Sequence, residues 1–246
     1  MSKLFKLKQW LTIEETAKHL SREWREPVSD ADVLQLGLDD VLKLSVNFVN
    51  PVPAMCGEVV SVEGAVWEII ETDEGTVTEL KSIDIGKERY VNFNDSEVKR
   101  VKGVYDLIVS HDALSDINKR FQLIVEGPKV KPDINHDGIF VELEGNAYRI
   151  HVDIEDIEFI AGTRAHTDKL KERINNGEIV GEEATKLLEQ NKKDRKEILL
   201  MPCEEHFIFS AFELPEDDSI LVVRTSAIDD FLNGQNKEAA PPKATL

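Results

Sequence analysis

The sequence predicts an α+β protein in which the two ends of the chain form a helix-turn-helix unit and the middle forms an antiparallel, strand-rich domain. Three observations lead to this fold class: two helix-capping patterns near the start, short apolar runs separated by turn residues in the middle, and a continuous apolar run near the end. The expected divisions are 1–50 with 206–234 (helix-turn-helix unit), 51–162 (acidic antiparallel β domain), 163–205 (helical hairpin insertion) and 235–246 (disordered tail).

The first helix is predicted by a capping box. The hydroxyl of Thr12 can accept a hydrogen bond from the N–H of Glu15, and the Glu15 side chain can reach back to the N–H of Thr12. A helix is therefore expected to begin at Ile13 and to end before Pro27. Its apolar residues recur in steps of four, three and four, so they share one face: Ile13, Ala17, Leu20 and Trp24.

A second helix and a strand follow. Ser29 and Asp32 repeat the capping pattern, with Asp in place of Glu, so this helix is expected to begin at about Asp30. Its expected buried residues are Val33, Leu34, Leu38 and Val41. From Leu42 to Phe48 apolar and polar residues alternate, which predicts a half-buried strand, and residues 50–53 are expected to lead out of the unit.

The order helix, turn, helix, strand resembles the excisionase and MerR-type winged helix, and WLTIEETAKHL is similar to the opening helix of that family. The segment Ile220–Gly234 resembles the strand and short helix that close such modules. Together these resemblances imply a discontinuous winged-helix-like unit with the middle of the chain inserted in it. The segment SREWREPV is longer than the family's usual turn between the helices. The opening and the VVRTSA segment also resemble uncharacterised bacterial proteins, a resemblance that implies no activity.

The middle of the chain is expected to form an antiparallel meander or a small barrel. Short strands separated by turn signals are expected at Glu58–Val62, Val66–Thr72, Val77–Ile85, Arg89–Phe93, Val98–Val101 and Tyr105–Val109. Apolar residues at helical spacing then predict a helix between Leu114 and Ile124. Two alternating runs, 139–143 and 148–152, predict a hairpin with Gly145–Asn146 as its two-residue turn.

Towards the end, Thr167–Ile198 is predicted to form a charged helical hairpin, with a narrow apolar stripe made of Leu170, Ile174, Ala184, Leu187 and Leu188. Such an insertion is either a solvated arm or a packing surface for a second copy, which would make a homodimer. Residues 207–212 are expected to form a strand. The apolar run Ile220–Val223 should be buried on both faces beside the strand at 42–48. A short helix capped by Ser226 should then bury Ile228 and Phe231 and end at Gly234.

The composition describes an acidic globular protein. Of the 246 residues 48 are Asp or Glu and 30 are Lys or Arg, giving a net charge of −18, and the middle is the most acidic part, with 23 acidic and 11 basic residues in 51–162. Such a field repels nucleic acid and anionic membranes. There is neither a signal peptide pattern nor a membrane-spanning apolar run, so a cytoplasmic protein without a membrane partner is expected. Cys56 and Cys203 are expected to be ordinary thiols.

One segment matches a calcium-binding pattern. Asp133, Asn135, Asp137 and Glu144, with Gly138, satisfy the EF-hand loop. An EF-hand has one helix before the loop and one after it. Here prolines precede the loop and the hairpin turn follows it, so we expect a polar loop rather than a metal site. We also find no phosphate-binding loop, nucleophile elbow or HExxH pattern, so neither a catalytic residue nor a cofactor is expected.

The candidate DNA-binding residues lie in the first unit. They are Lys18, Arg22, Arg25, Gln35 and Lys43, with Lys3, Lys6 and Lys8 nearby. The second helix, which reads bases in a winged helix, carries four aspartates counting Asp39 and Asp40, and no Lys or Arg. The favoured interpretation is therefore a non-catalytic regulatory or adaptor protein that acts through protein contacts. The alternatives are an excisionase or MerR-like DNA-binding protein and an acidic mimic of DNA.

Overall fold

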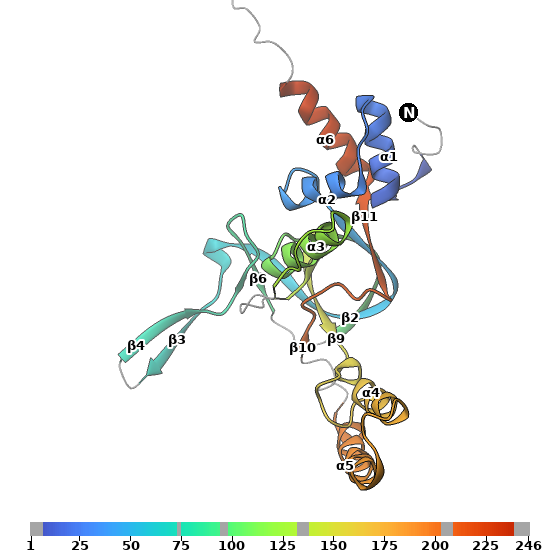
Figure 1. Ribbon diagram of the computed structural model, residues 1–246. Coiled ribbons are helices and arrows are strands. Elements are labelled where there is room, and N and C mark those ends of the chain that lie inside the picture. The colour runs from blue at the N-terminus through green and yellow to red at the C-terminus, as the bar shows by residue number, and fades with distance from the viewer. Residues whose placement is uncertain (1–6, 73–74, 94–97, 132–137, 203–208, 239–246) are drawn as a thin grey trace, which may run out of the picture.

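The computed structural model describes residues 7–72, 75–93, 98–131, 138–202 and 209–238, with the side chains of 68–79 and 235–238 left out. Within these residues the fold is α+β, as predicted, with six α-helices and a nine-stranded antiparallel sheet (Figure 1). In chain order the elements are β1 (Trp10–Thr12), α1 (Ile13–Trp24), α2 (Asp30–Leu38), β2 (Ser45–Ser61), η2 (Val62–Gly64), β3 (Trp67–Thr72), β4 (Gly75–Leu80), β5 (Ile83–Asp84), β6 (Arg89–Asn92), β7 (Val98–Leu107), α3 (His111–Ile124), β8 (Phe140–Leu143), β9 (Asn146–Val152), η3 (Ile154–Asp156), α4 (Arg164–Asn175), α5 (Gly181–Leu200), β10 (Phe209–Ser210), β11 (Ser219–Arg224) and α6 (Thr225–Glu238).

The two N-terminal helices begin where their capping residues predict. At α1, the N–H of Glu15 donates to Thr12 Oγ1 and the N–H of Thr12 donates to Glu15 Oε2. At α2, Ser29 and Asp32 make the same reciprocal pair. Both capping boxes are therefore confirmed, and each satisfies backbone donors that a helix start leaves open.

Strand β2 is the centre of the sheet. It pairs with β7, β7 pairs with β8, β8 pairs with β9, and β9 pairs back with β2, so these four strands close a small barrel. The expected exit from the first unit at 50–53 was wrong, because β2 runs through Pro51 and Pro53 without a break. A register shift between Phe48 and Val52 places Pro51 in an irregularity of the ladder, where a missing N–H leaves no gap in the pairing.

The core fills this barrel and continues under the helices. Alternate residues of β2, including Phe48 and Ala54, are fully buried, as period-two patterning requires. Phe48 and Tyr148 both pack edge-to-face against Tyr105, with ring centroids 5.8 and 5.4 Å apart. Leu20 of α1 belongs to the same buried cluster, so the core of the N-terminal helices and that of the barrel are continuous.

The C-terminal segment returns to the N-terminal helices, as predicted. Strand β11 pairs with β2, with Val222 opposite Ser45, and it pairs with β1 on its other edge. Ile228 and Phe231 of α6 are buried in the shared core, and the Phe231 ring lies 5.7 Å from that of Trp24. Three of the four residues in the apolar run of β11 are buried, but Ile220 is 39% exposed.

Two further boundaries differ from expectation. Helix α6 begins at Thr225 and continues past Gly234 to Glu238, so the first residues assigned to the tail are helical. Glycine only disfavours a helix interior by about 1 kcal/mol and does not by itself end one. The turn of the β8–β9 hairpin is Glu144–Gly145, one residue earlier than expected, because Leu143 pairs with Asn146. Both turn residues have positive φ, at 52° and 81°, as a type I′ turn requires.

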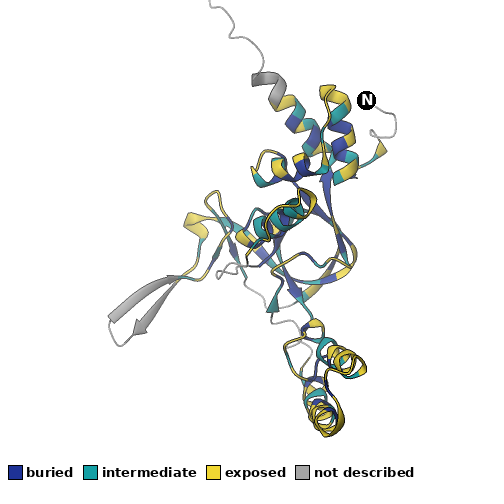
Figure 2. Cartoon of the chain, in the orientation of Figure 1, coloured by how far each residue is buried: buried dark blue, intermediate teal, exposed yellow. Residues whose placement is uncertain are grey.

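Two arms extend away from the barrel (Figure 1). One is the separate two-stranded hairpin of β3 and β4. The other is the α4–α5 helical hairpin, which confirms the prediction for this segment, and Figure 2 shows that its helices are largely exposed. Its apolar stripe is not quite the expected one, since Leu187 is 38% exposed and Ile179 of the connecting loop takes a place in the buried cluster.

Candidate functional site

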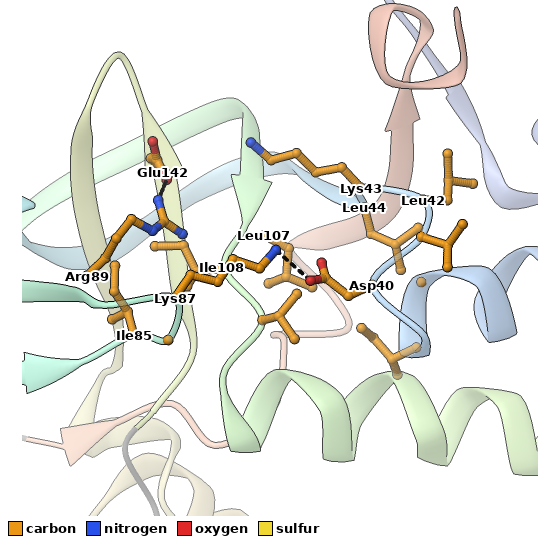
Figure 3. A pocket seen from close by; sticks show the side chains of 15 residues that line it. Asp40, Leu42, Lys43, Leu44, Ile85, Lys87, Arg89, Leu107, Ile108 and Glu142 are labelled. Atoms are coloured by element: carbon orange, nitrogen blue, oxygen red, sulfur yellow. Dashed lines mark hydrogen bonds and ion pairs between the residues drawn. The ribbon is translucent and has the colours of Figure 1, made fainter. Parts of the chain in front are cut away.

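A cleft of about 450 Å³ lies where four parts of the chain meet: the α2–β2 loop, the turn from β5 to β6, the end of β7 with the start of the following loop, and β8 (Figure 3). Ile117 of α3 closes it from the helical side. Volumes of this size are typical of ligand and peptide pockets. The cleft is therefore the principal candidate site among the described residues.

The floor of the cleft is apolar. Its buried side chains, each no more than 4% exposed, are Leu42, Leu44, Ile85, Leu107, Ile108 and Ile117. Gly37 of α2 allows the helix to lie directly on this floor, because a Cβ at this position would come within 2.4 Å of Leu44 Cδ1. A partner that places an apolar group here gains by removing it from water, at about 25 cal/mol per Å².

Two ion pairs form the rim. Lys87 Nζ lies 2.5 Å from Asp40 Oδ2, and Arg89 Nη1 lies 2.9 Å from Glu142 Oε2 (Figure 3). Asp40 and Lys87 both have positive φ, at 54° and 57°, a conformation that is uncommon for residues with a side chain. Such conformations are found at binding and switching sites, where the surrounding structure holds the backbone in place. The rim offers hydrogen-bonding groups of both charges.

The charged side chains of the lining are paired with one another or with a neighbour. Among the fifteen lining residues there is no Ser, Thr, Cys, His or Tyr, and the only two carboxylates, on Asp40 and Glu142, are each paired with a cation. Lysine amines also act as nucleophiles and bases, but both lysines of the lining are held in ion pairs, Lys87 with Asp40 and Lys43 with Asp106. Every charged side chain of the lining is therefore already engaged in an ion pair.

A cluster of polar side chains lies beside the cleft and includes Lys43 from its lining. Asp106 of β7 accepts hydrogen bonds from Ser45 Oγ (2.9 Å) and Arg224 Nε (2.6 Å), and its Oδ2 lies 2.9 Å from Lys43 Nζ. Burial raises the pKa of Asp106, but the hydrogen bonds from Lys43, Arg224 and Ser45 outweigh burial and leave the pKa below its ordinary value. Asp106 is therefore charged at neutral pH.

The candidate DNA-binding residues are scattered, and most already have partners. Lys18 pairs with Glu14, Gln35 Nε2 donates to Asp39 Oδ1 at 2.9 Å, and Lys43 pairs with Asp106. Arg22 and Arg25 are exposed on and just after α1. Lys8 pairs with Glu15, whereas Lys3 and Lys6 lie outside the described residues. Asp32 and Gln35 of α2 are exposed, as is Asp39 at its C-cap, so the face of this helix that is open to a partner is acidic.

The calcium candidates are only partly described. Asp133, Asn135 and Asp137 lie outside the described residues, and Glu144 occupies the β8–β9 turn. Within the described part of the chain no group of three or more His, Cys, Asp or Glu side chains could hold a metal ion. The same part contains no helix that is long and apolar enough to cross a membrane.

Sequence reasoning missed the cleft because its lining comes from segments far apart in the chain. The one available signal was the turn at Gly86–Lys87, which sequence alone marks as a turn and not as a binding element. No protein-family model, no curated protein and no solved structure was found to match this chain. The function is therefore argued from the geometry alone.

Proposed function

We propose that the protein is a non-catalytic regulatory or adaptor protein that binds a segment of a partner protein in the cleft between α2, the β5–β6 turn and β8. The observation that carries this proposal is the lining: an apolar floor bordered by ion pairs that engage all of its charged side chains. One or two apolar side chains of a partner would fill the floor. The polar groups of the partner's backbone would meet Lys87 and Glu142 at the rim.

This proposal keeps the N-terminal helices as a winged-helix-like scaffold rather than as a DNA reader. In such a unit the second helix approaches phosphates, and each uncompensated carboxylate there opposes binding. The open face of α2 carries Asp32 and Asp39, and Gln35 is held by Asp39. We propose that the protein carries out this role in the cytoplasm.

A photo-crosslinking experiment with a matched control tests the cleft. Val41 lines the cleft and is 48% exposed, and Val62, remote in sequence in η2, is 47% exposed. A photoreactive amino acid at position 41, introduced in the native cell, should cross-link one defined protein that position 62 does not capture. With the purified partner, Val41→Asp should then weaken binding at least about tenfold while Val62→Asp leaves it unchanged.

Two results would contradict the proposal. One is an equal pattern of cross-links from positions 41 and 62. The other is a nanomolar complex with a defined DNA site, measured by fluorescence anisotropy at physiological salt and lost on Gln35→Ala, since non-specific binding is typically no tighter than about 10⁻⁶ M. That result would restore α2 as a reading helix.

A further inference from the structure

The strongest concentration of positive charge in a described pocket lies on the α4–α5 arm. A groove of about 430 Å³ between the two helices is lined by Arg164, Thr167, Asp168, Lys171, Asn191, Lys192, Arg195 and Lys196. Five of these eight residues are cationic and one is acidic, in a protein whose net charge is −18. A local reversal of the overall charge is a feature that an anionic ligand would recognise.

Two of the cations, Arg195 and Arg164, are held in place by contacts with η3. Arg195 Nη1 pairs with Glu155 Oε2 and also donates to the carbonyl oxygen of Gly162 at 3.3 Å. Arg164 pairs with Asp156, and its own N–H donates to Glu155 Oε2 at 2.8 Å. Both guanidinium groups are therefore anchored to η3 and oriented before any ligand arrives, which lowers the entropy lost on binding.

Two others have no counter-ion among the described residues. Lys192 and Lys196 are exposed one helical turn apart on α5, about 6 Å along the axis. Like charges at this spacing destabilise a helix. The residues three and four positions before Lys196 on α5 are Lys193 and Lys192. These two positions therefore offer Lys196 no negative charge. An anion bound between the two ammonium groups would relieve the repulsion.

A buried amide joins the two helices beneath the groove. Asn191 is only 6% exposed and lines the groove; its Nδ2 donates to Thr167 Oγ1 at 3.0 Å. Its carbonyl oxygen has no hydrogen-bond partner among the described residues and is covered by protein atoms. The amide therefore helps to hold α5 against α4, and the contacts to a ligand are left to the cations.

We propose that this groove binds a small molecule carrying a diphosphate group, with Lys192 and Lys196 contacting the phosphates. Several cations around one groove suit a ligand with more than one negative charge, and oriented guanidinium groups match phosphate oxygens. A small ligand is favoured over nucleic acid because a long polyanion would also meet the acidic remainder of the protein. The site is independent of the cleft and of its proposed partner.

The test uses two double variants with the same change in charge. Lys192→Ala with Lys196→Ala removes the two groove lysines, and Lys186→Ala with Lys193→Ala removes two lysines of α5 that do not line the groove. Isothermal titration calorimetry with inorganic pyrophosphate should show saturable binding to the full chain. The groove variant should lose at least about tenfold in affinity, and the control should keep it within about twofold. Circular dichroism checks that both variants are folded.

Three outcomes would overturn the proposal. The first is the absence of saturable binding of pyrophosphate to the unaltered protein at millimolar concentration. The second is an equal loss in both double variants, which would show general charge attraction. The third is tighter binding of a single-stranded RNA oligonucleotide than of pyrophosphate, with loss in the groove variant, which would make the groove a nucleic-acid interface.

Discussion

Arg224 donates a hydrogen bond from Nε to Asp106 Oδ1 at 2.6 Å, although 118 residues separate them in the chain. Its Nη2 donates to the carbonyl oxygen of Val104 at 2.7 Å. Arg224 ends β11 and Asp106 lies on β7, and β2 runs between these strands in the sheet. The pair therefore clamps the C-terminal segment across the start of β2, where Ser45 also donates to Asp106.

Replacing Arg224 with Gln should destabilise the protein by about 1.5–3 kcal/mol, the range for hydrogen bonds to a charged group. The substitution keeps much of the side chain's length but leaves the half-buried carboxylate of Asp106 with fewer donors. Urea denaturation measures the free energy of unfolding. Arg22→Gln is the control, because Arg22 is exposed on α1 and should change stability by less than about 0.5 kcal/mol. Equal losses in both variants would show that the clamp contributes nothing specific.

The same cluster gives a pH dependence. The net effect of burial, which raises the pKa of Asp106, and of its hydrogen-bond donors, which lower it, is a pKa below the ordinary value of 3.8. The charged Asp106 therefore adds to the free energy of unfolding above pH 3.8, and this contribution is lost as the pH falls through the pKa of Asp106 in the folded state. Asp116 works in the opposite direction, since burial raises its pKa despite the hydrogen bond from Arg120.

Comparing the protein with its Asp106→Asn variant at each pH cancels the contribution of Asp116. The neutral amide does not titrate, so the advantage of the unaltered protein should be constant from pH 7 to about pH 5 and should shrink below about pH 4. Thermal melts across this range provide the measurement. An advantage that grows on acidification would contradict the assigned charge state of Asp106.

The packing of the C-terminal segment can be tested with one residue type in two environments. Ile228 of α6 is fully buried in the shared core, whereas Ile220 of β11 is 39% exposed. Ile228→Ala should cost about 2–5 kcal/mol, and Ile220→Ala less than about 1 kcal/mol. Chemical denaturation of both variants measures the difference. If the two costs were similar, α6 would not be part of the core that holds the N-terminal helices.

Local sequence patterns predicted most of the elements but only part of the architecture. The capping boxes at Thr12 and Ser29 place helix starts correctly because the interactions involve residues three apart. The pairing of β11 with β2 followed from a continuous apolar run that needed burial. A small barrel was one of the two forms expected for the middle of the chain, but the strands that close it could not be predicted, because β9 returns to β2 through pairs such as Cys56 with Tyr148, which no local pattern records.

The candidate sites depend even more on long-range contacts. In the sequence, Asp40 is an acidic residue near the end of the second helix and Lys87 is part of a turn. Only the fold brings their charges together in an ion pair. The prolines in β2 misled the sequence interpretation. Pro51 lies at a register shift, where a missing N–H breaks no pairing, and Pro53 stays in register opposite Arg100. Charge counts over whole segments likewise concealed the basic groove, because the acidic residues of α4 and α5 mostly lie outside it.

The attachment of the helical arm rests on a glycine. Gly162 has φ of +87°, and a Cβ at this position would lie 2.4 Å from the backbone carbon of Asp194 in α5. Gly145 has a similar φ of +81° but open space around it. Gly145→Ala should therefore cost only the strain of a left-handed alanine, about 1–2 kcal/mol. Gly162→Ala carries the same strain and in addition forces α5 away from the loop, for about 1–3 kcal/mol more.

Hydrogen exchange is the appropriate measurement, because it reports opening of the arm separately from unfolding of the barrel. In Gly162→Ala, amides of α5 around Asp194 should exchange at least about tenfold faster, whereas those of β2 should keep their protection. In Gly145→Ala, α5 should exchange as in the unaltered protein. Faster exchange of α5 in both variants, or in neither, would show that close packing at Gly162 does not hold the arm.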